Sequence, residues 1–96
     1  MCYEYDPEKD RKNNEKLGIA FWQAAEVFED PQRIEAYDQD HSTLEEERWQ
    51  TIGQTKESKV LFVVFAEKIE ETIRIISARR ATEREKTLYS KQKSRR

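Results

Sequence analysis

Residues 59–66, which read KVLFVVFA, limit the possible folds of this chain more than any other stretch. The run has the length of a strand and is continuously apolar, which is typical of a strand covered on both faces. Charged residues make up 40% of the chain and apolar residues 35%, so the core is small and this run is expected at its centre. The remaining apolar residues also cluster into short runs, which favours a fold over disorder.

Residues 70–81, which read EETIRIISARRA, predict a second strand, paired with the first as a hairpin across a turn at 67–69. Regular alternation places Arg74 and Arg79 on opposite faces of this strand, and Arg80 follows where the strand ends. An unpaired buried charge is costly. Arg74 is therefore expected to lie on a solvated face, to pair with a carboxylate elsewhere in the chain, or to belong to a binding site.

Local signals predict three helices. The first begins at Asp6 and Pro7, an N-cap followed by a proline at the first helical position, and ends at Gly18. The last begins at the capping box formed by Thr82 and Glu85. The second ends near residues 29–31, and its apolar face comprises Phe21, Ala24, Ala25 and Phe28, widened by Trp22 and Val27.

Three further strands are expected at residues 2–6, 32–38 and 46–53, with a polar loop at 39–45. The order of elements indicates an α+β fold: a small antiparallel sheet with two N-terminal helices and one C-terminal helix, packed on one side of the sheet. No boundary divides the chain. We therefore expect a single domain over residues 1–90 and a basic, mobile tail over residues 91–96.

Cysteine and histidine are scarce. With Cys2 as the one cysteine, an intramolecular disulfide is impossible, and with one histidine the usual zinc-ligand sets are absent. No apolar segment approaches the roughly 18 residues of a membrane span, and the N-terminus lacks a signal-peptide pattern. These features predict a cytoplasmic protein that uses no cofactor or metal and does not bind membranes.

Charge is distributed unevenly along the chain. Residues 79–96 contain eight Lys or Arg and two Glu, whereas the chain as a whole carries a net charge of −2, so residues 1–78 carry −8. A basic end suits an anion such as a nucleic-acid backbone, and an acidic body suits a basic partner. A solvated helix with a frayed basic end explains the same pattern equally well.

Several residues could form an anion site. On the first helix, Lys9, Asn13 and Lys16 form one polar stripe that could bind phosphate, although such spacing more commonly marks a solvated face. Arginine pairs well with phosphate, and a cluster of guanidinium groups can stabilise a phosphoryl-transfer transition state without a metal. His41 in the polar loop could act as a general base or could simply be exposed. The arginines considered for the open face are Arg48, Arg74 and Arg79.

An ordered series of short motifs over residues 5 to about 89 resembles the BrnT family of bacterial toxins. The most specific member of the series is IRIISARRA at 73–81. The others are YDPEK at 5–9, NxxK at 13–16, GIAF at 18–21, AxVFxDP at 25–31, His41, EERW at 46–49, Ile52-Gly53, VLFVV at 60–64, Glu83-Arg84 and Tyr89.

The resemblance implies a RelE-like fold and the toxin of a type II toxin–antitoxin system. Such a toxin would be a metal-independent endoribonuclease that arrests growth by cleaving RNA through attack of a 2′-hydroxyl on the adjacent phosphate. It would be neutralised by a BrnA-like antitoxin in a hetero-oligomer, expected to be a heterotetramer, and would contact DNA only through that antitoxin. The implied catalytic residues are Arg74, Arg79, Arg48 and His41, and the implied RNA-binding residues are Lys9, Lys16, Arg80 and Tyr89.

Two positions depart from the family pattern. Leu17 stands where the family commonly has histidine, and Tyr5 stands where it often has tryptophan. If the family histidine transfers a proton, this chain is either weakened or inactive, or His41 substitutes for it. Two other functions therefore stay open: a nucleic-acid-binding domain without chemistry, and a degenerate toxin that only binds its antitoxin.

Overall fold

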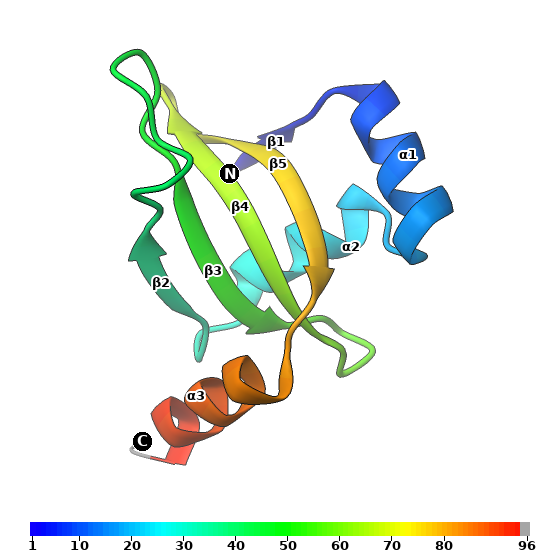
Figure 1. Ribbon diagram of the computed structural model, residues 1–96, viewed down its shortest axis with the longest axis vertical. Coiled ribbons are helices and arrows are strands. Elements are labelled where there is room, and N and C mark those ends of the chain that lie inside the picture. Colours follow the sequence, from blue (N-terminus) through cyan, green and yellow to red (C-terminus); the bar gives the residue numbers. More distant parts are fainter. Residues whose placement is uncertain (95–96) are drawn as a thin grey trace.

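The computed structural model describes residues 1–94, which form a five-stranded sheet and three α-helices (Figure 1). The strand order is β1-β5-β4-β3-β2, so β4 is the central strand, as its continuous apolar run predicts. In chain order the elements are β1 (Cys2–Glu4), α1 (Pro7–Leu17), α2 (Phe21–Glu26), the 3-10 helix η1 (Val27–Glu29), β2 (Ile34–Tyr37), β3 (Trp49–Gln54), β4 (Val60–Lys68), β5 (Thr72–Arg80) and α3 (Glu83–Ser94).

The sheet is mixed, which corrects the expected all-antiparallel arrangement. Strands β2, β3, β4 and β5 pair antiparallel in succession, whereas β1 lies parallel to β5, with Tyr3 opposite Ile73. The alternation of side chains that marks a strand is the same in both directions. The sequence pattern therefore could not predict the direction of β1 relative to β5, and the tertiary structure shows it.

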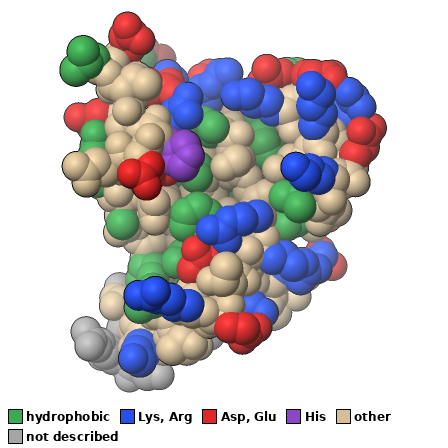
Figure 2. Space-filling model, in the orientation of Figure 1, with side chains coloured by type: hydrophobic (Ala, Val, Ile, Leu, Met, Phe, Trp, Pro, Cys, Tyr) green, Lys and Arg blue, Asp and Glu red, His purple; other side chains and the backbone are tan. Residues whose placement is uncertain are grey.

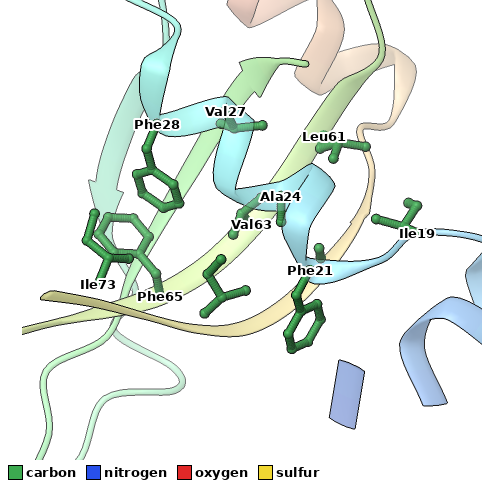
Figure 3. Close-up of a cluster of buried hydrophobic side chains, with 11 residues drawn as sticks. Ile19, Phe21, Ala24, Val27, Phe28, Leu61, Val63, Phe65 and Ile73 are labelled. Atoms are coloured by element: carbon green, nitrogen blue, oxygen red, sulfur yellow. The ribbon is translucent and has the colours of Figure 1, made fainter. Parts of the chain in front are cut away.

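One face of the sheet is covered by α2 and η1, and the main hydrophobic core lies between them (Figure 3). Val63 and Phe65 of β4 are 0% and 1% exposed beneath this layer. The rings of Phe28 and Phe65 meet edge to face, with centroids 4.8 Å apart. The buried members of this core are Ile19, Phe21, Ala24, Val27, Phe28, Leu61, Val63, Phe65, Ile73, Ile75 and Ala78.

Helix α3 packs on the other face, so the expectation that all helices lie on one side is wrong. Its Tyr89 is buried and belongs to a second apolar cluster with Ile52 and Ala81, against which Phe62 packs. The Tyr89 hydroxyl donates a hydrogen bond of 2.6 Å to Asp30. Burial and this bond both raise the pKa of Tyr89. Only one end of this face is crossed by α3 (Figure 1), and the rest is called the open face below.

The ends of α1 form as the sequence predicts. The Asp6 carboxylate accepts the N–H of Glu8 at 2.9 Å, Pro7 begins the helix, and Gly18 ends it with φ of 70°. The last helix also begins as predicted, because Thr82 and Glu85 form both hydrogen bonds of the capping box.

Several boundaries differ from the predictions. The turn between β4 and β5 falls at residues 69–71, where Glu70 and Glu71 adopt positive φ, rather than at 67–69. Strand β3 begins at Trp49 rather than at residue 46. Trp22, expected to widen the apolar face of its helix, is 58% exposed. The expected mobile tail at 91–96 lies partly outside the described residues, and α3 itself runs to Ser94.

No α-helix within residues 1–94 has both the length and the apolar character that a membrane span requires.

Gly53 of β3 lies against η1 at a distance that excludes a side chain. A Cβ atom at this position would lie 2.6 Å from Cγ1 of Val27 and 3.0 Å from Cβ of Arg33. We expect Gly53→Ala to lower the free energy of unfolding by about 1–3 kcal/mol, the usual cost of overpacking a core. Urea unfolding of the purified variant measures this loss.

Val27→Ala provides the matched test, because it removes the Cγ1 atom that the new methyl group would meet. Gly53→Ala should therefore cost less in the Val27→Ala background than in the parent chain. An equal cost in both backgrounds would show that the close approach to Val27 is not the cause.

Candidate active site

A β-bulge in β5 brings Arg74 and Arg79 to the same face of the sheet, which corrects the opposite faces predicted from regular alternation. Val64 of β4 lies opposite Ser77 and Phe65 lies opposite Ile75, so the residue between them, Ile76, has no partner across the pair. The extra residue changes which side chains face the core. Ile75 and Ala78 are both buried against α2, whereas Arg74, Ser77 and Arg79 belong to the open face.

A hollow of about 370 Å³ lies on the open face. Helix α1, the loop after β2, and strands β3, β4 and β5 all contribute to it. Figure 2 shows this face of the molecule, with the one histidine of the chain in the upper left part and Lys and Arg side chains above it and toward the centre and right. The hollow is lined by Asn13, Leu17, Asp38, His41, Gln50, Phe62, Val64, Ile76, Ser77, Ala78 and Arg79.

Arg79 is held in place from two directions. Its guanidinium carbon lies 4.1 Å from the ring centroid of Phe62, a stacked cation–π contact. Its Nη1 and Nη2 atoms donate to the two carboxylate oxygens of Glu85 at 2.8 and 3.0 Å, and Nη1 also donates to the Arg80 carbonyl. The bond to Glu85 raises the pKa of Arg79 and lowers the pKa of the Glu85 carboxyl, so both groups stay charged at neutral pH.

One edge of the Arg79 guanidinium stays open. Within residues 1–94, its Nε–H and the second N–H of Nη2 have no hydrogen-bond acceptor. These two N–H groups point the same way in the planar fork of arginine, and their spacing matches two oxygens of a phosphate. Arg79 can therefore bind an oxyanion while it stays paired with Glu85.

His41 lies in the loop after β2 and contacts the carboxylate of Asp38. Its Nδ1 atom is 3.0 Å from Oδ1 and 2.9 Å from Oδ2 of that residue. The Asp38 side chain is 4% exposed, whereas the His41 side chain is 62% exposed. An imidazole that is buried on one side and open on the other is placed to exchange a proton with a bound molecule.

The lining of the hollow combines apolar surface with amide and hydroxyl groups. Leu17, Val64 and Ile76 provide apolar surface on which a flat ring could lie. The Asn13 side chain is fixed because its Nδ2 donates to the Ile19 carbonyl at 2.8 Å. Gln50, from β3, adds a second amide, of the kind that can bond to the edge of a nucleobase.

Six of the eight predicted site residues do not line the hollow, and four of these lie on other elements than α1. Arg74 is on the open face but pairs with Glu4 at 3.3 Å. Arg48 pairs with Glu46 at 3.1 Å. Arg80 is exposed, and Tyr89 is 4% exposed within the second apolar cluster, so its ring is not available to RNA in this structure.

The two predicted lysines lie beside the hollow. Lys9 and Lys16 are exposed on α1, the helix that contributes Asn13 and Leu17 to the lining. Of all the predicted site residues, the structure thus places His41 and Arg79 together in the hollow and the two lysines on the helix that borders it.

Sequence reasoning did not identify Asp38. The signal was present as an Asp-x-x-His spacing at 38–41, but such a spacing is common in polar loops and says nothing about burial. Gln50 and Ser77 were also not identified, because their place in the hollow depends on the register of three strands.

Within residues 1–94, no group of three or more His, Cys, Asp or Glu side chains could hold a metal ion.

The Arg79–Glu85 pair predicts a pH dependence of stability. The pKa of Glu85 is lower in the folded chain than its ordinary value of 4.5, so the pair stabilises the fold fully above that pH. The contribution is lost as the pH falls through the lowered value. Because the Arg79 side chain is 43% exposed and water screens it, we expect Glu85→Gln to cost only about 0.5–1 kcal/mol at pH 7.

Glutamine also serves in a capping box, so Glu85→Gln isolates the charge from the helix cap. Urea unfolding at pH 7 and pH 3 should give a difference between variant and parent that shrinks in acid. A difference of the same size at both pH values would contradict the charge pair as its origin.

Residues 5–85 match the family described as "Ribonuclease toxin, BrnT, of type II toxin-antitoxin system". Among solved structures, the chain is similar to the ribonuclease toxin BrnT of Brucella abortus, with a TM-score of 0.60 and 19% identity over 86% of this chain and 100% of that one. No curated protein sequence matches. The family match covers most of the chain, and we conclude that this protein belongs to the BrnT family of ribonuclease toxins of type II toxin–antitoxin systems.

Proposed function

We propose that this chain is an active, metal-independent endoribonuclease whose site is the hollow on the open face. The observation that carries the proposal is the presence of His41 and Arg79 in that one hollow, a proton acceptor and a fixed cation. Those two groups provide proton transfer and charge stabilisation, the two forms of assistance that internal RNA cleavage needs. Family membership supports the same reaction class. The RelE-like classification of the fold stays a prediction.

In the proposed reaction, a ribose 2′-hydroxyl attacks the adjacent phosphorus atom. His41 accepts the hydroxyl proton at Nε2, the 2′-oxygen bonds to phosphorus, and the bond from phosphorus to the 5′-oxygen breaks. The leaving oxygen takes a proton from solvent, so the products are a 2′,3′-cyclic phosphate and a 5′-hydroxyl. The open Nε–Nη2 edge of Arg79 stabilises the negative charge that grows on the phosphoryl oxygens.

RNA reaches the hollow along basic side chains. Lys9 and Lys16 are on α1, the helix that contributes Asn13 and Leu17 to the hollow. Arg80 follows Arg79 at the end of β5 but lies opposite Leu61, on the other face of the sheet, so it contacts RNA only where the RNA passes around that end. All three are exposed, as contacts to a phosphate backbone require. Arg74 shares the open face and neutralises charge further along the strand while it keeps Glu4 as its partner.

Leu17 does not exclude activity, because its side chain lines the same hollow as His41. A histidine at position 17 and one at position 41 would therefore face the same bound phosphate. We infer that His41 performs the proton transfer that a histidine at position 17 would provide in other members of the family. Tyr5, the other departure, packs its ring edge-on against Phe21, with centroids 5.6 Å apart.

The family implies an antitoxin as the partner. We propose that it is BrnA-like, that it forms a heterotetramer with this toxin in the cytoplasm, and that it makes the DNA contacts of the complex. The acidic body of the chain, with a net charge of −8 over residues 1–78, supports a basic binding segment in that partner.

Growth arrest and RNA cleavage by the chain expressed without its antitoxin test this function. We expect His41→Gln and Arg79→Ala each to lower the cleavage rate by about 10²–10³-fold, because each removes one of the two reacting groups. Arg74→Ala should lower it less, because Arg74 lies outside the hollow. Rates on a labelled RNA, with folding checked by circular dichroism, provide the measurement.

Arg11→Ala is the matched control, because Arg11 is an exposed arginine of α1 whose partners are Glu8 and Glu15. It should leave cleavage unchanged. A parent chain that binds its antitoxin but neither arrests growth nor cleaves RNA would favour the degenerate toxin, and Leu17→His would then be expected to restore activity.

The salt dependence of RNA binding tests the two lysines. In the His41→Gln background, where RNA stays intact, Lys9→Ala and Lys16→Ala should each reduce the slope of log affinity against log salt by about 0.7, as for one lost phosphate contact. Titration of a labelled single-stranded RNA at several salt concentrations measures the slope. Lys56→Ala, in the turn between β3 and β4, should leave it unchanged, and equal slopes for all three variants would remove the lysines from the binding site.

A further inference from the structure

We propose that Asp38 is a positioning residue: its buried carboxylate holds the His41 imidazole with the proton on Nδ1 and leaves Nε2 free to accept a proton in the hollow. The tautomer itself follows from the contacts of these two side chains. Its catalytic meaning rests on the proposed ribonuclease function.

The tautomer follows from the chemistry of the contact. An ionised carboxylate accepts hydrogen bonds and cannot donate them. Both Asp38 oxygens lie within 3.0 Å of His41 Nδ1, so this nitrogen carries the proton. In a neutral imidazole the other nitrogen, Nε2, then holds the lone pair. The residue that contacts Nδ1 thus decides which nitrogen is available to a substrate.

The contact between Asp38 and His41 is not needed to close the loop after β2. A carboxylate can cap a turn, and Asp38 Oδ1 does accept the backbone N–H of His41 at 3.2 Å. However, the loop is closed independently by the backbone of Asp38 and by Ser42. The Asp38 N–H donates to the Arg48 carbonyl at 2.9 Å, and the Ser42 hydroxyl donates to the Asp38 carbonyl at 2.7 Å and accepts the Arg48 N–H at 2.8 Å.

Burial of the carboxylate strengthens this interpretation. The Asp38 residue is 3% exposed, and a buried charge is costly unless it is paired. Within residues 1–94, the side chain found on this carboxylate is that of His41, from the same loop. Asp38, which follows the end of β2, therefore places a buried carboxylate against Nδ1 of His41, whose side chain is otherwise exposed.

The ionisable groups of the hollow are distributed in keeping with this role. Three of the lining residues are ionisable: Asp38, His41 and Arg79. Arg79 is paired with Glu85 of α3, whereas the Asp38 carboxylate contacts Nδ1 of His41. The contact with Asp38 thus occupies one nitrogen of the ring and leaves the other without a partner among the described residues.

The first experiment reads the tautomer directly. Because the chain has one histidine, the ring nitrogens of uniformly ¹⁵N-labelled protein give a long-range ¹⁵N–¹H correlation spectrum that needs no assignment. Above the pH at which the ring loses its charge, the parent chain should show a protonated Nδ1 and an unprotonated Nε2. In Asp38→Asn the amide oxygen can keep the His41 backbone N–H, which turns the amide NH₂ toward Nδ1. Asp38→Ala presents nothing to the ring, so both variants should shift population toward a protonated Nε2.

The second experiment reads the consequence for cleavage. Asp38→Asn should lower the cleavage rate by about 10²–10⁴-fold, the range of positioned proton transfer, and leave the affinity for a 2′-O-methyl RNA unchanged. Ser42→Ala is the matched control, because it loosens the loop and keeps the Asp38–His41 contact. Its tautomer should match that of the parent, and its rate should fall far less than that of Asp38→Asn.

The outcomes separate the two proposals. If the parent chain cleaves no RNA, the proposed function fails, whereas the tautomer spectrum still tests the contact. A parent ring with its proton on Nε2, or an unchanged tautomer in both Asp38 variants while they stay folded, would overturn the inference. A loss of cleavage in Ser42→Ala as large as that in Asp38→Asn would overturn it as well, since loop closure alone would then explain the effect.

Discussion

The unpaired Ile76 in β5 determines which side chains the open face presents. With regular alternation, Arg79 would share the face of Ile73 and Ile75 and would lie against α2, where a guanidinium is costly to bury. The bulge places Ala78 in the core instead, where it is 2% exposed. One extra residue thus moves a cation from the core side of the sheet to the hollow, which is a common use of bulges beside functional sites.

Once Arg79 is on the open face, its geometry depends on helix α3. Glu85 accepts the Thr82 N–H as part of the capping box and also accepts two hydrogen bonds from Arg79. The carboxylate that begins the helix is thus the one that orients the guanidinium. Phe62 fixes the plane of the guanidinium from below. The start of α3 and the Arg79 guanidinium are therefore linked through one carboxylate, and a displacement of this helix would move the cation.

The helices and strands could be predicted from signals between residues close in the sequence. The features that could not be predicted depend on how strands far apart in the sequence pair with one another. Asp6, Gly18 and the Thr82–Glu85 box each act within a few residues, so the helix ends could be predicted from the sequence. The parallel direction of β1 and the bulge at Ile76 depend on which strand lies alongside, which alternation does not encode. For the same reason His41 and Arg79 could be named as candidates, whereas their meeting in one hollow, with Asp38 buried behind the imidazole, could not be predicted.

The hollow also explains how a proton acceptor could change position without loss of the site. Position 17 ends α1 and position 41 lies in the loop after β2, and both line the same hollow as Arg79. The proposed chemistry requires an imidazole and a cation in one hollow, and a histidine at either position would share the hollow with Arg79. Position 41 has the buried carboxylate of Asp38 behind its ring. In the proposed mechanism, Leu17 then provides only apolar surface to the hollow, and His41 provides the proton transfer.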